Sequence, residues 1–241
     1  MSKGNRDRAE KARRIVEQQK AAERRRQVTI WTSVAVAVVL VIAGFVGYAT
    51  LAGQDQGKLV TPGVAVDEGT AFAVGTGPVT VDVYEDFMCP NCKNFETSSG
   101  GTLRQMATAN KITLRYHVVS ILDRVSNGTK YSTRSAGAAA AAAEEGKFPE
   151  FHDALYANQP EEGSDGLTNA KIIELAKSVG VTSDKFADAV NGGTYEPWVT
   201  HVTEVFSERH FNATPTVVVN GTQIPSPSLA NITQAIEKAA G

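Results

Sequence analysis

Residues 79–96 read VTVDVYEDFMCPNCKNFE, and this stretch decides the fold of the chain around it. Apolar and polar residues alternate from Val79 to Tyr84, which is typical of a half-buried strand. Cys89 and Cys92 follow where the strand pattern ends and a helix is expected to begin. Sulfur atoms at this spacing can form a strained, easily opened disulfide, and the chain contains only these two cysteines. The stretch therefore predicts a redox-active dithiol at a strand-to-helix junction.

Two other interpretations of the cysteine pair are weaker. Zinc sites normally need four ligands, and the sequence has neither a second cysteine pair nor a His-x-x-x-His spacing. A purely structural disulfide that closes so short a loop would constrain the unfolded chain little. We therefore expect dithiol chemistry at Cys89 and Cys92, with no metal and no cofactor.

The charge of the chain is distributed unevenly. Residues 1–27 carry ten Lys and Arg against four Asp and Glu, a net charge of +6, whereas the remainder carries 14 against 22, a net charge of −8. An acidic main part argues against nucleic acid as its partner.

Residues 28–52 contain no Asp, Glu, Lys or Arg. A helix of this length exceeds the roughly 30 Å hydrocarbon core of a bilayer, so we predict a transmembrane helix here. The basic residues 1–27 are then expected to stay in the cytoplasm, which places the rest of the chain outside it. This predicts a single-pass protein of the cell membrane. The alternative is a cleaved signal peptide ending near Ala52, but its basic and apolar parts would both be unusually long.

The remaining sequence predicts a flexible linker and one α/β domain. Residues 53–70 are rich in Gly, Gln, Asp and Pro, as linkers are. In residues 71–241, strands are predicted at 71–74, 79–84, 111–120 and 222–224, and within 212–221, a segment with a proline at its mouth and an Asn-Gly turn at its end. Helices are predicted after Cys92 to about Ala109, with a break at 98–101, and at 136–145, 148–156, 168–179, 183–190, 196–210 and 229–240. The predicted order is β-α-β, a helical insertion at about 131–192, one more helix, then β-β-α.

Three segments carry a family resemblance in this order. They are residues 85–96 (EDFMCPNCKNFE), 146–156 (GKFPEFHDALY) and 214–221 (TPTVVVNG). Together with the predicted topology they resemble the DsbA-like thiol:disulfide oxidoreductases of the thioredoxin-fold superfamily, in a membrane-anchored bacterial form. The resemblance implies a thioredoxin fold with a helical insertion between its β-α-β and β-β-α halves, preceded here by the transmembrane helix.

The site residues follow from the motif and from the resemblance. Cys89, at the helix start, is expected to be the nucleophile, because unpaired backbone N–H groups there stabilise a thiolate. Cys92 is expected to be more buried and to act as the resolving thiol. Pro90 suits the first helical turn, and Asn91 adds an uncharged polar group. The resemblance implies a cis peptide bond at Thr214-Pro215 facing the motif, where it would bind substrate.

The chain departs from its relatives at two positions. Val83 occupies the place of a buried acidic residue six positions before the first cysteine, which puts the proton relay assigned to that acid in doubt. Glu96 matches a second acidic position and could tune the site. Asn91 replaces a histidine of the best-known oxidase. Asp86 and Lys93 flank the motif and could tune Cys89 in opposite directions, but a surface charge is the simpler interpretation.

The predicted function is oxidation of dithiols in exported proteins by the Cys89–Cys92 disulfide, outside the cytoplasm. The resemblance implies a quinone-linked membrane partner that reoxidises the enzyme. The motif does not fix the direction of exchange, so a disulfide reductase or isomerase of the cell envelope is an alternative. A tethered thioredoxin-fold module that binds a partner without catalysis is another.

Overall fold

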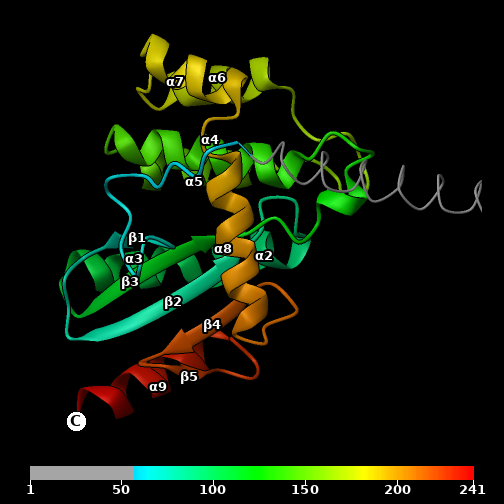
Figure 1. The fold of residues 1–241 in the computed structure, drawn as a ribbon. Coiled ribbons are helices and arrows are strands. Elements are labelled where there is room, and N and C mark those ends of the chain that lie inside the picture. Colours follow the sequence, from blue (N-terminus) through cyan, green and yellow to red (C-terminus); the bar gives the residue numbers. More distant parts are fainter. Residues whose placement is uncertain (1–56) are drawn as a thin grey trace, which may run out of the picture. The chain divides into compact units, whose positions relative to one another are not determined.

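A five-stranded sheet organises the described part of the chain, residues 57–241 of a computed structural model (Figure 1). The strands are β1 (Phe72–Val74), β2 (Val79–Glu85), β3 (Ile112–Val118), β4 (Thr216–Val219) and β5 (Thr222–Gln223). Their order is β1-β3-β2-β4-β5, with β2 and β3 parallel and the other pairs antiparallel. The predicted strands and the parallel β-α-β unit are thus present.

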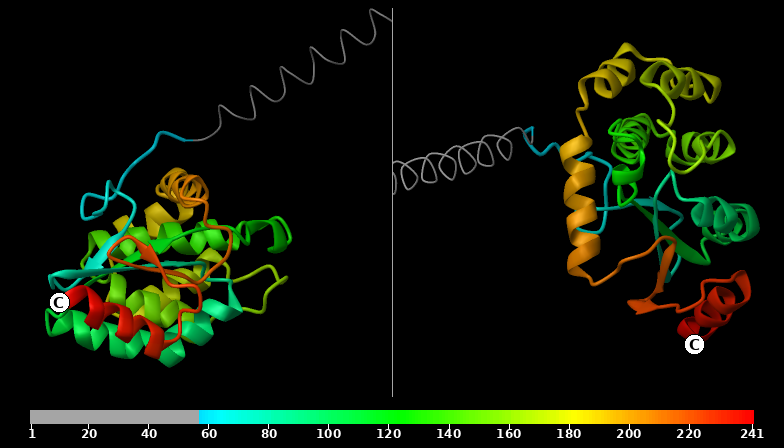
Figure 2. Two further views of the ribbon diagram at one scale, coloured as in Figure 1. Left: turned by 90° about the horizontal axis from the view of Figure 1, so that it is seen from below. Right: turned by 90° about the vertical axis from the view of Figure 1, so that its right-hand side faces the viewer.

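Helices cover both faces of the sheet (Figure 2). One face carries α3 (Gly101–Thr108) and α9 (Leu229–Ala240), and the other carries α8 (Glu196–Glu208). The chain reaches α3 from β2 through α2 (Pro90–Phe95) and a π-helical turn, η1 (Glu96–Gly100). This arrangement places the start of α2 at the carboxyl end of β2.

A helical insertion separates β3 from α8. After the short 3-10 turn η2 (Asp123–Val125) it comprises α4 (Tyr131–Glu144), α5 (Phe148–Ala157), α6 (Asn169–Ser178) and α7 (Asp184–Gly192). The alanine run of α4 is buried, and α4 contacts α5, α6, α7 and α8. Small side chains let these helices approach closely, because little volume separates their backbones. The alanine-rich stretch therefore acts as the centre of the insertion.

The antiparallel pairing of β2 with β4 places two distant segments side by side. Tyr84, near the end of β2, is the partner of Thr216 at the start of β4. The loop that follows β2 and the loop that precedes β4 therefore lie at the same edge of the sheet. These two loops contain the cysteine motif and Thr214.

The predicted membrane segment lies outside the described residues. The cytoplasmic segment 1–27, the transmembrane helix 28–52 and the first residues of the linker all precede residue 57. Within residues 57–241, none of the helices has the length and apolar character that a membrane crossing requires.

The predicted linker ends earlier than expected. Asp67 forms an ion pair with Arg115 at 2.7 Å, and the Gly69 carbonyl accepts a hydrogen bond of 2.6 Å from the Trp198 indole. Val66 also forms a β-bridge with Ala71. Polar composition predicted a tether here, but these polar groups have partners in the folded domain. Residues 66–70 are therefore part of the domain.

The predicted break at residues 98–101 is instead the π-helical turn η1, which joins α2 and α3. The side chain of Glu96 passes over Gly100, and a Cβ atom at Gly100 would lie 2.1 Å from Glu96 Oε2. A Cβ atom at Gly101 would have no neighbour within 4 Å. The first glycine makes room for a buried carboxylate, whereas the second does not.

This difference predicts opposite effects for two neighbouring substitutions. Gly101→Ala should raise the free energy of unfolding by up to about 1 kcal/mol, because alanine is the better helix former. Gly100→Ala should instead lower it by about 1–3 kcal/mol, because Glu96 has to move. Urea unfolding of both variants checks this, and equal stabilisation by both would show that Glu96 does not need the space.

Candidate active site

The two cysteines lie at the start of α2 and differ in accessibility. Cys89 is the N-cap residue, and Cys92 lies within the first turn of the helix. Both are free thiols; Cys89 is 6% exposed and Cys92 is fully buried. Cys92 is therefore the more deeply buried of the two cysteines, as the sequence predicted.

The surroundings of the two thiols shift their pKa values in opposite directions. A hydrogen bond from the Cys92 thiol lowers the pKa of Cys89 to about 6, outweighing burial, and the backbone amides of Asn91 and Cys92 also stabilise the thiolate. Burial raises the pKa of Cys92 well above its usual range, and the Cys89 thiolate and the Glu85 carboxylate raise it further. At neutral pH the pair is one thiolate and one thiol, which is the arrangement that disulfide exchange needs.

Thr214 lies directly beside Cys89. The Thr214-Pro215 peptide bond is cis, as predicted, and the Thr214 carbonyl oxygen lies 3.4 Å from Cys89 Sγ, where it accepts a hydrogen bond when Cys89 is a protonated thiol. Both residues belong to the loop that the pairing of β2 with β4 holds at this edge of the sheet. Pro90 and Asn91, by contrast, are exposed on the first turn of α2. The structure thus brings together the motif and the Thr-Pro pair.

An acidic residue lies near the active site although position 83 is valine. Glu85 follows Val83 by two residues and is fully buried, and its charge contributes to the raised pKa of Cys92. Its carboxylate is hydrogen-bonded to His152 of α5, and its Oε2 atom has no partner. Burial alone would lower the pKa of His152, but Glu85 raises it to about 10. Glu85 and Val83 are two residues apart on β2 and therefore share a face of the sheet, so the strand pattern alone could have pointed to Glu85.

Glu96 is the third member of this buried group. It accepts a hydrogen bond of 2.7 Å from Arg104, and its Oε1 atom has no partner. Burial raises the pKa of Glu96 to about 7, and the charge of Glu85 adds to the effect. Glu96 therefore lies where it can influence the site electrostatically, through Glu85.

Asp86 is not a surface charge. It is fully buried in the loop between β2 and α2, and its carboxylate accepts hydrogen bonds from Met88 N, Leu122 N and Ser132 Oγ. The sequence did not reveal these donors, because Leu122 and Ser132 are far from Asp86 along the chain. Its position three residues before Cys89 makes it part of the site.

A second carboxylate–imidazole network lies on β2 and β3. Asp82 binds Arg115 through two hydrogen bonds of 2.5 and 2.8 Å and lies 3.1 Å from His117 Nε2. Here burial lowers the pKa of His117, so its imidazole is neutral. Arginine balances the carboxylates in this network, as Arg104 does at Glu96. The Asp82–His117 group and the Glu85–Glu96–His152 group are therefore ion-pair networks rather than metal sites.

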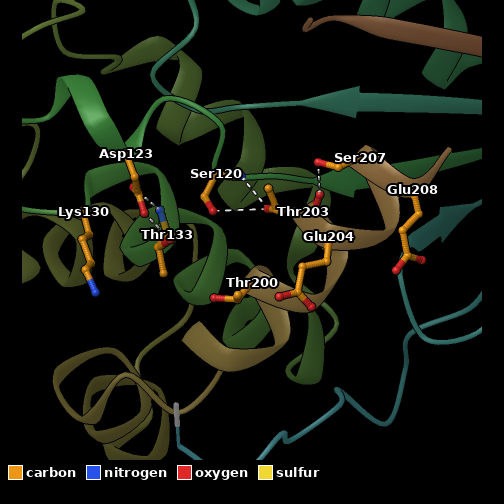
Figure 3. A pocket seen from close by; sticks show the side chains of 9 residues that line it. All are labelled: Ser120, Asp123, Lys130, Thr133, Thr200, Thr203, Glu204, Ser207 and Glu208. Atoms are coloured by element: carbon orange, nitrogen blue, oxygen red, sulfur yellow. Dashed lines mark hydrogen bonds between the residues drawn. The ribbon is translucent and has the colours of Figure 1, made fainter. Parts of the chain in front are cut away.

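A polar cleft of about 540 Å³ lies between α8 and the segment that follows β3 (Figure 3). Two pairs of side chains in its lining are hydrogen-bonded: Asp123 accepts from Thr133, and Ser120, which follows β3, pairs with Thr203. The lining includes neither a residue of the cysteine motif nor Thr214.

A family model described as thioredoxin matches residues 70–238 of the chain. The match includes the cysteine motif, the buried acids Glu85, Asp86 and Glu96, and the Thr214-Pro215 loop.

Two solved structures from Mycobacterium tuberculosis are similar over most of their length. Reduced DsbA is 34% identical with a TM-score of 0.62, and the alignment covers 71% of this chain and 93% of DsbA. The reduced disulfide bond oxidoreductase DsbG is also 34% identical, with a TM-score of 0.63 and coverage of 73% and 89%.

A curated relative has a different overall organisation. The serine/threonine-protein kinase PknE of M. tuberculosis is 27% identical over 161 residues, which cover 63% of this chain but only 28% of the kinase. The chain thus corresponds to a minor part of that protein.

Removal of the Cys92 thiol should raise the pKa of Cys89. A hydrogen bond to a charged group contributes about 1.5–3 kcal/mol, so Cys92→Ala should raise this pKa by about 1 to 2. Cys92→Ser keeps a hydroxyl donor and should raise it less. The pH dependence of Cys89 alkylation by iodoacetamide measures both values, and a midpoint near 6 in both variants would rule out this hydrogen bond as the main cause.

His152 should make stability depend on pH in the alkaline range. Its pKa of about 10 exceeds the value of about 6.5 in the unfolded chain. Its contribution is therefore complete below pH 6.5 and is lost as pH rises to 10, by up to about 5 kcal/mol. Urea unfolding of the oxidised protein, in which the thiols do not titrate, should show this loss.

The matched control is His117, which is also fully buried but has a lowered pKa. His152→Gln should abolish the loss of stability between pH 6.5 and 10, whereas His117→Gln should preserve it. If His152→Gln keeps the alkaline loss, His152 is not charged in the folded protein.

Proposed function

The chain belongs to the thioredoxin family and is a thiol-disulfide oxidoreductase, and we propose that it works in the oxidising direction, as a dithiol oxidase for exported proteins. The observation that carries this proposal is the contrast between the two thiols. The lowered pKa of Cys89 stabilises the reduced enzyme, and stabilisation of the reduced form makes a disulfide a stronger oxidant.

The proposed reaction proceeds through a mixed disulfide. A substrate thiolate attacks the Sγ atom of Cys89, the less buried cysteine, and the Cys89–Cys92 bond breaks. Cys92 leaves and takes up a proton, as its raised pKa favours. A second substrate thiolate then attacks the substrate sulfur of the mixed disulfide and releases Cys89 as a thiolate. A low pKa makes Cys89 a good leaving group in this second step.

The Thr214 loop is the proposed binding site for substrate. Its main chain lies next to Cys89, and the Thr214 hydroxyl is buried without a partner. An extended substrate segment that pairs with this backbone would place its cysteine beside the Cys89 sulfur. Pro90 and Asn91 are exposed next to the same sulfur and would contact the segment from the other side.

The cellular setting is part of the proposal and follows from the sequence. A basic segment followed by 25 residues without charge supports an anchor in the cell membrane, with residues 57–241 outside the cytoplasm. The reduced enzyme must lose two electrons before another turnover. A quinone-linked membrane protein is the partner we propose for that step.

The reduction potential tests the direction of exchange. Equilibration of the protein with glutathione should give a value of about −120 to −180 mV, the range of thiol oxidants, and the protein should oxidise a reduced model peptide. Cys89→Ser should abolish this activity, because no disulfide can form. A potential near that of thioredoxin, about −270 mV, would instead assign the protein to disulfide reduction.

A further inference from the structure

Asp86 is a buried carboxylate with an unusual set of partners. Its side chain is fully buried and accepts hydrogen bonds of 2.8 Å from Met88 N, 3.0 Å from Leu122 N and 2.7 Å from Ser132 Oγ. All three donors are uncharged. Within residues 57–241, Asp86 forms no ion pair, whereas Asp82 and Glu96 each bind an arginine. A buried carboxylate without a cation is costly when it is ionised.

The loop that joins Asp86 to Cys89 is held in place. The Asp86 carbonyl accepts hydrogen bonds from Cys89 N at 2.9 Å and from the Tyr156 hydroxyl at 3.3 Å. Gln159 Nε2 donates to the carbonyls of Phe87 and Cys89 at 3.0 and 2.9 Å. The carboxylate therefore cannot move away from a negative charge at Cys89 without breaking several hydrogen bonds. Uptake of a proton is the remaining way to reduce the repulsion.

The titratable groups that face Asp86 come from three elements. Cys89 and Cys92 belong to the motif, Tyr131 to α4 and Tyr156 to α5. Burial raises the pKa of Asp86 to about 7, and the Cys89 thiolate adds to the effect while the three hydrogen bonds oppose it. Burial holds both tyrosines protonated, with pKa values raised above the ordinary one. The charge of Cys89 thus acts on a carboxyl group that has no cation to balance it.

We propose that Asp86 is a positioning residue that binds a proton when the Cys89–Cys92 disulfide is reduced and releases it when the disulfide forms. A substrate dithiol gives up two electrons and two protons as its own disulfide forms. The enzyme accepts the electrons by breaking the S–S bond. One proton goes to the Cys92 thiol and the second to the Asp86 carboxyl, so that Cys89 remains a thiolate and the net charge of the site does not change. The proposal rests on the proposed dithiol exchange, and it applies whether the enzyme oxidises or reduces its substrate.

Proton uptake during reduction tests this directly. At pH 6.5 the full-length protein should take up more protons per disulfide than Asp86→Asn, in which the uptake should be close to one. The midpoint of Cys89 alkylation should change little in Asp86→Asn, because the Asp86 carboxyl group is already neutral when the thiolate forms. Equal proton uptake by the two proteins would overturn the proposal.

Ser132→Ala is the matched control, because it removes one donor but keeps the carboxyl group. Loss of this hydrogen bond favours the protonated form of Asp86, so the additional proton uptake should shift to higher pH rather than disappear. A structural role alone would not predict this shift.

If Asp86→Asn does not fold, the proposal can be tested on the wild-type protein. Infrared difference spectra of the full-length protein labelled with ¹³C-aspartate should show a protonated aspartate carboxyl that appears on reduction at pH 6.5. The absence of that band would overturn the proposal. Neither result depends on the reduction potential, so this proposal and the proposed direction of exchange can fail separately.

Discussion

The site depends on the difference between two sulfur atoms separated by two residues. The pKa of Cys89 is lowered to about 6 because the Cys92 thiol and the backbone amides of Asn91 and Cys92 stabilise the thiolate. Cys92 stays protonated because it is fully buried close to Glu85. The first condition depends on the second, since the hydrogen bond to Cys89 requires a protonated Cys92. The start of α2 and the pairing of β2 with β4 fix this geometry.

The helical insertion builds much of the surroundings of the dithiol. His152 of α5 balances Glu85, Ser132 of α4 binds Asp86, and Gln159 after α5 holds the Cys89 loop. Each buried acid near the motif is stabilised differently: Glu85 by an imidazolium, Glu96 by Arg104 and Asp86 by uncharged donors only. Burial raises the pKa values of both Asp86 and Glu96 to about 7, and the Cys89 charge adds to the effect at Asp86. The helical insertion thus supplies hydrogen-bond partners for Glu85 and Asp86, two of the acids near the cysteine motif.

The sequence predicted the parts of the site that depend on local patterns. The strand before Cys89, the helix start at Pro90 and the cis bond at Thr214-Pro215 lie as expected. It did not predict the buried acids, because the burial of Glu85 and Asp86 depends on partners far away along the chain. Polar composition was misleading at Asp67, whose ion pairs with Arg115 and Arg209 bind the predicted linker to the domain. The glycines at 100 and 101 predicted a break, but the first of them accommodates Glu96 inside a continuous helical segment.

The central claim is that the folded protein stabilises the reduced dithiol more than the disulfide. The free energies of unfolding of the reduced and oxidised proteins at pH 7 test it most directly, because their difference measures how the fold favours one redox state. A disulfide ordinarily stabilises a protein, by up to about 5 kcal/mol, through its effect on the unfolded chain. Here the reduced protein should be the more stable one, since only the folded chain stabilises the Cys89 thiolate. A more stable oxidised protein would contradict the account.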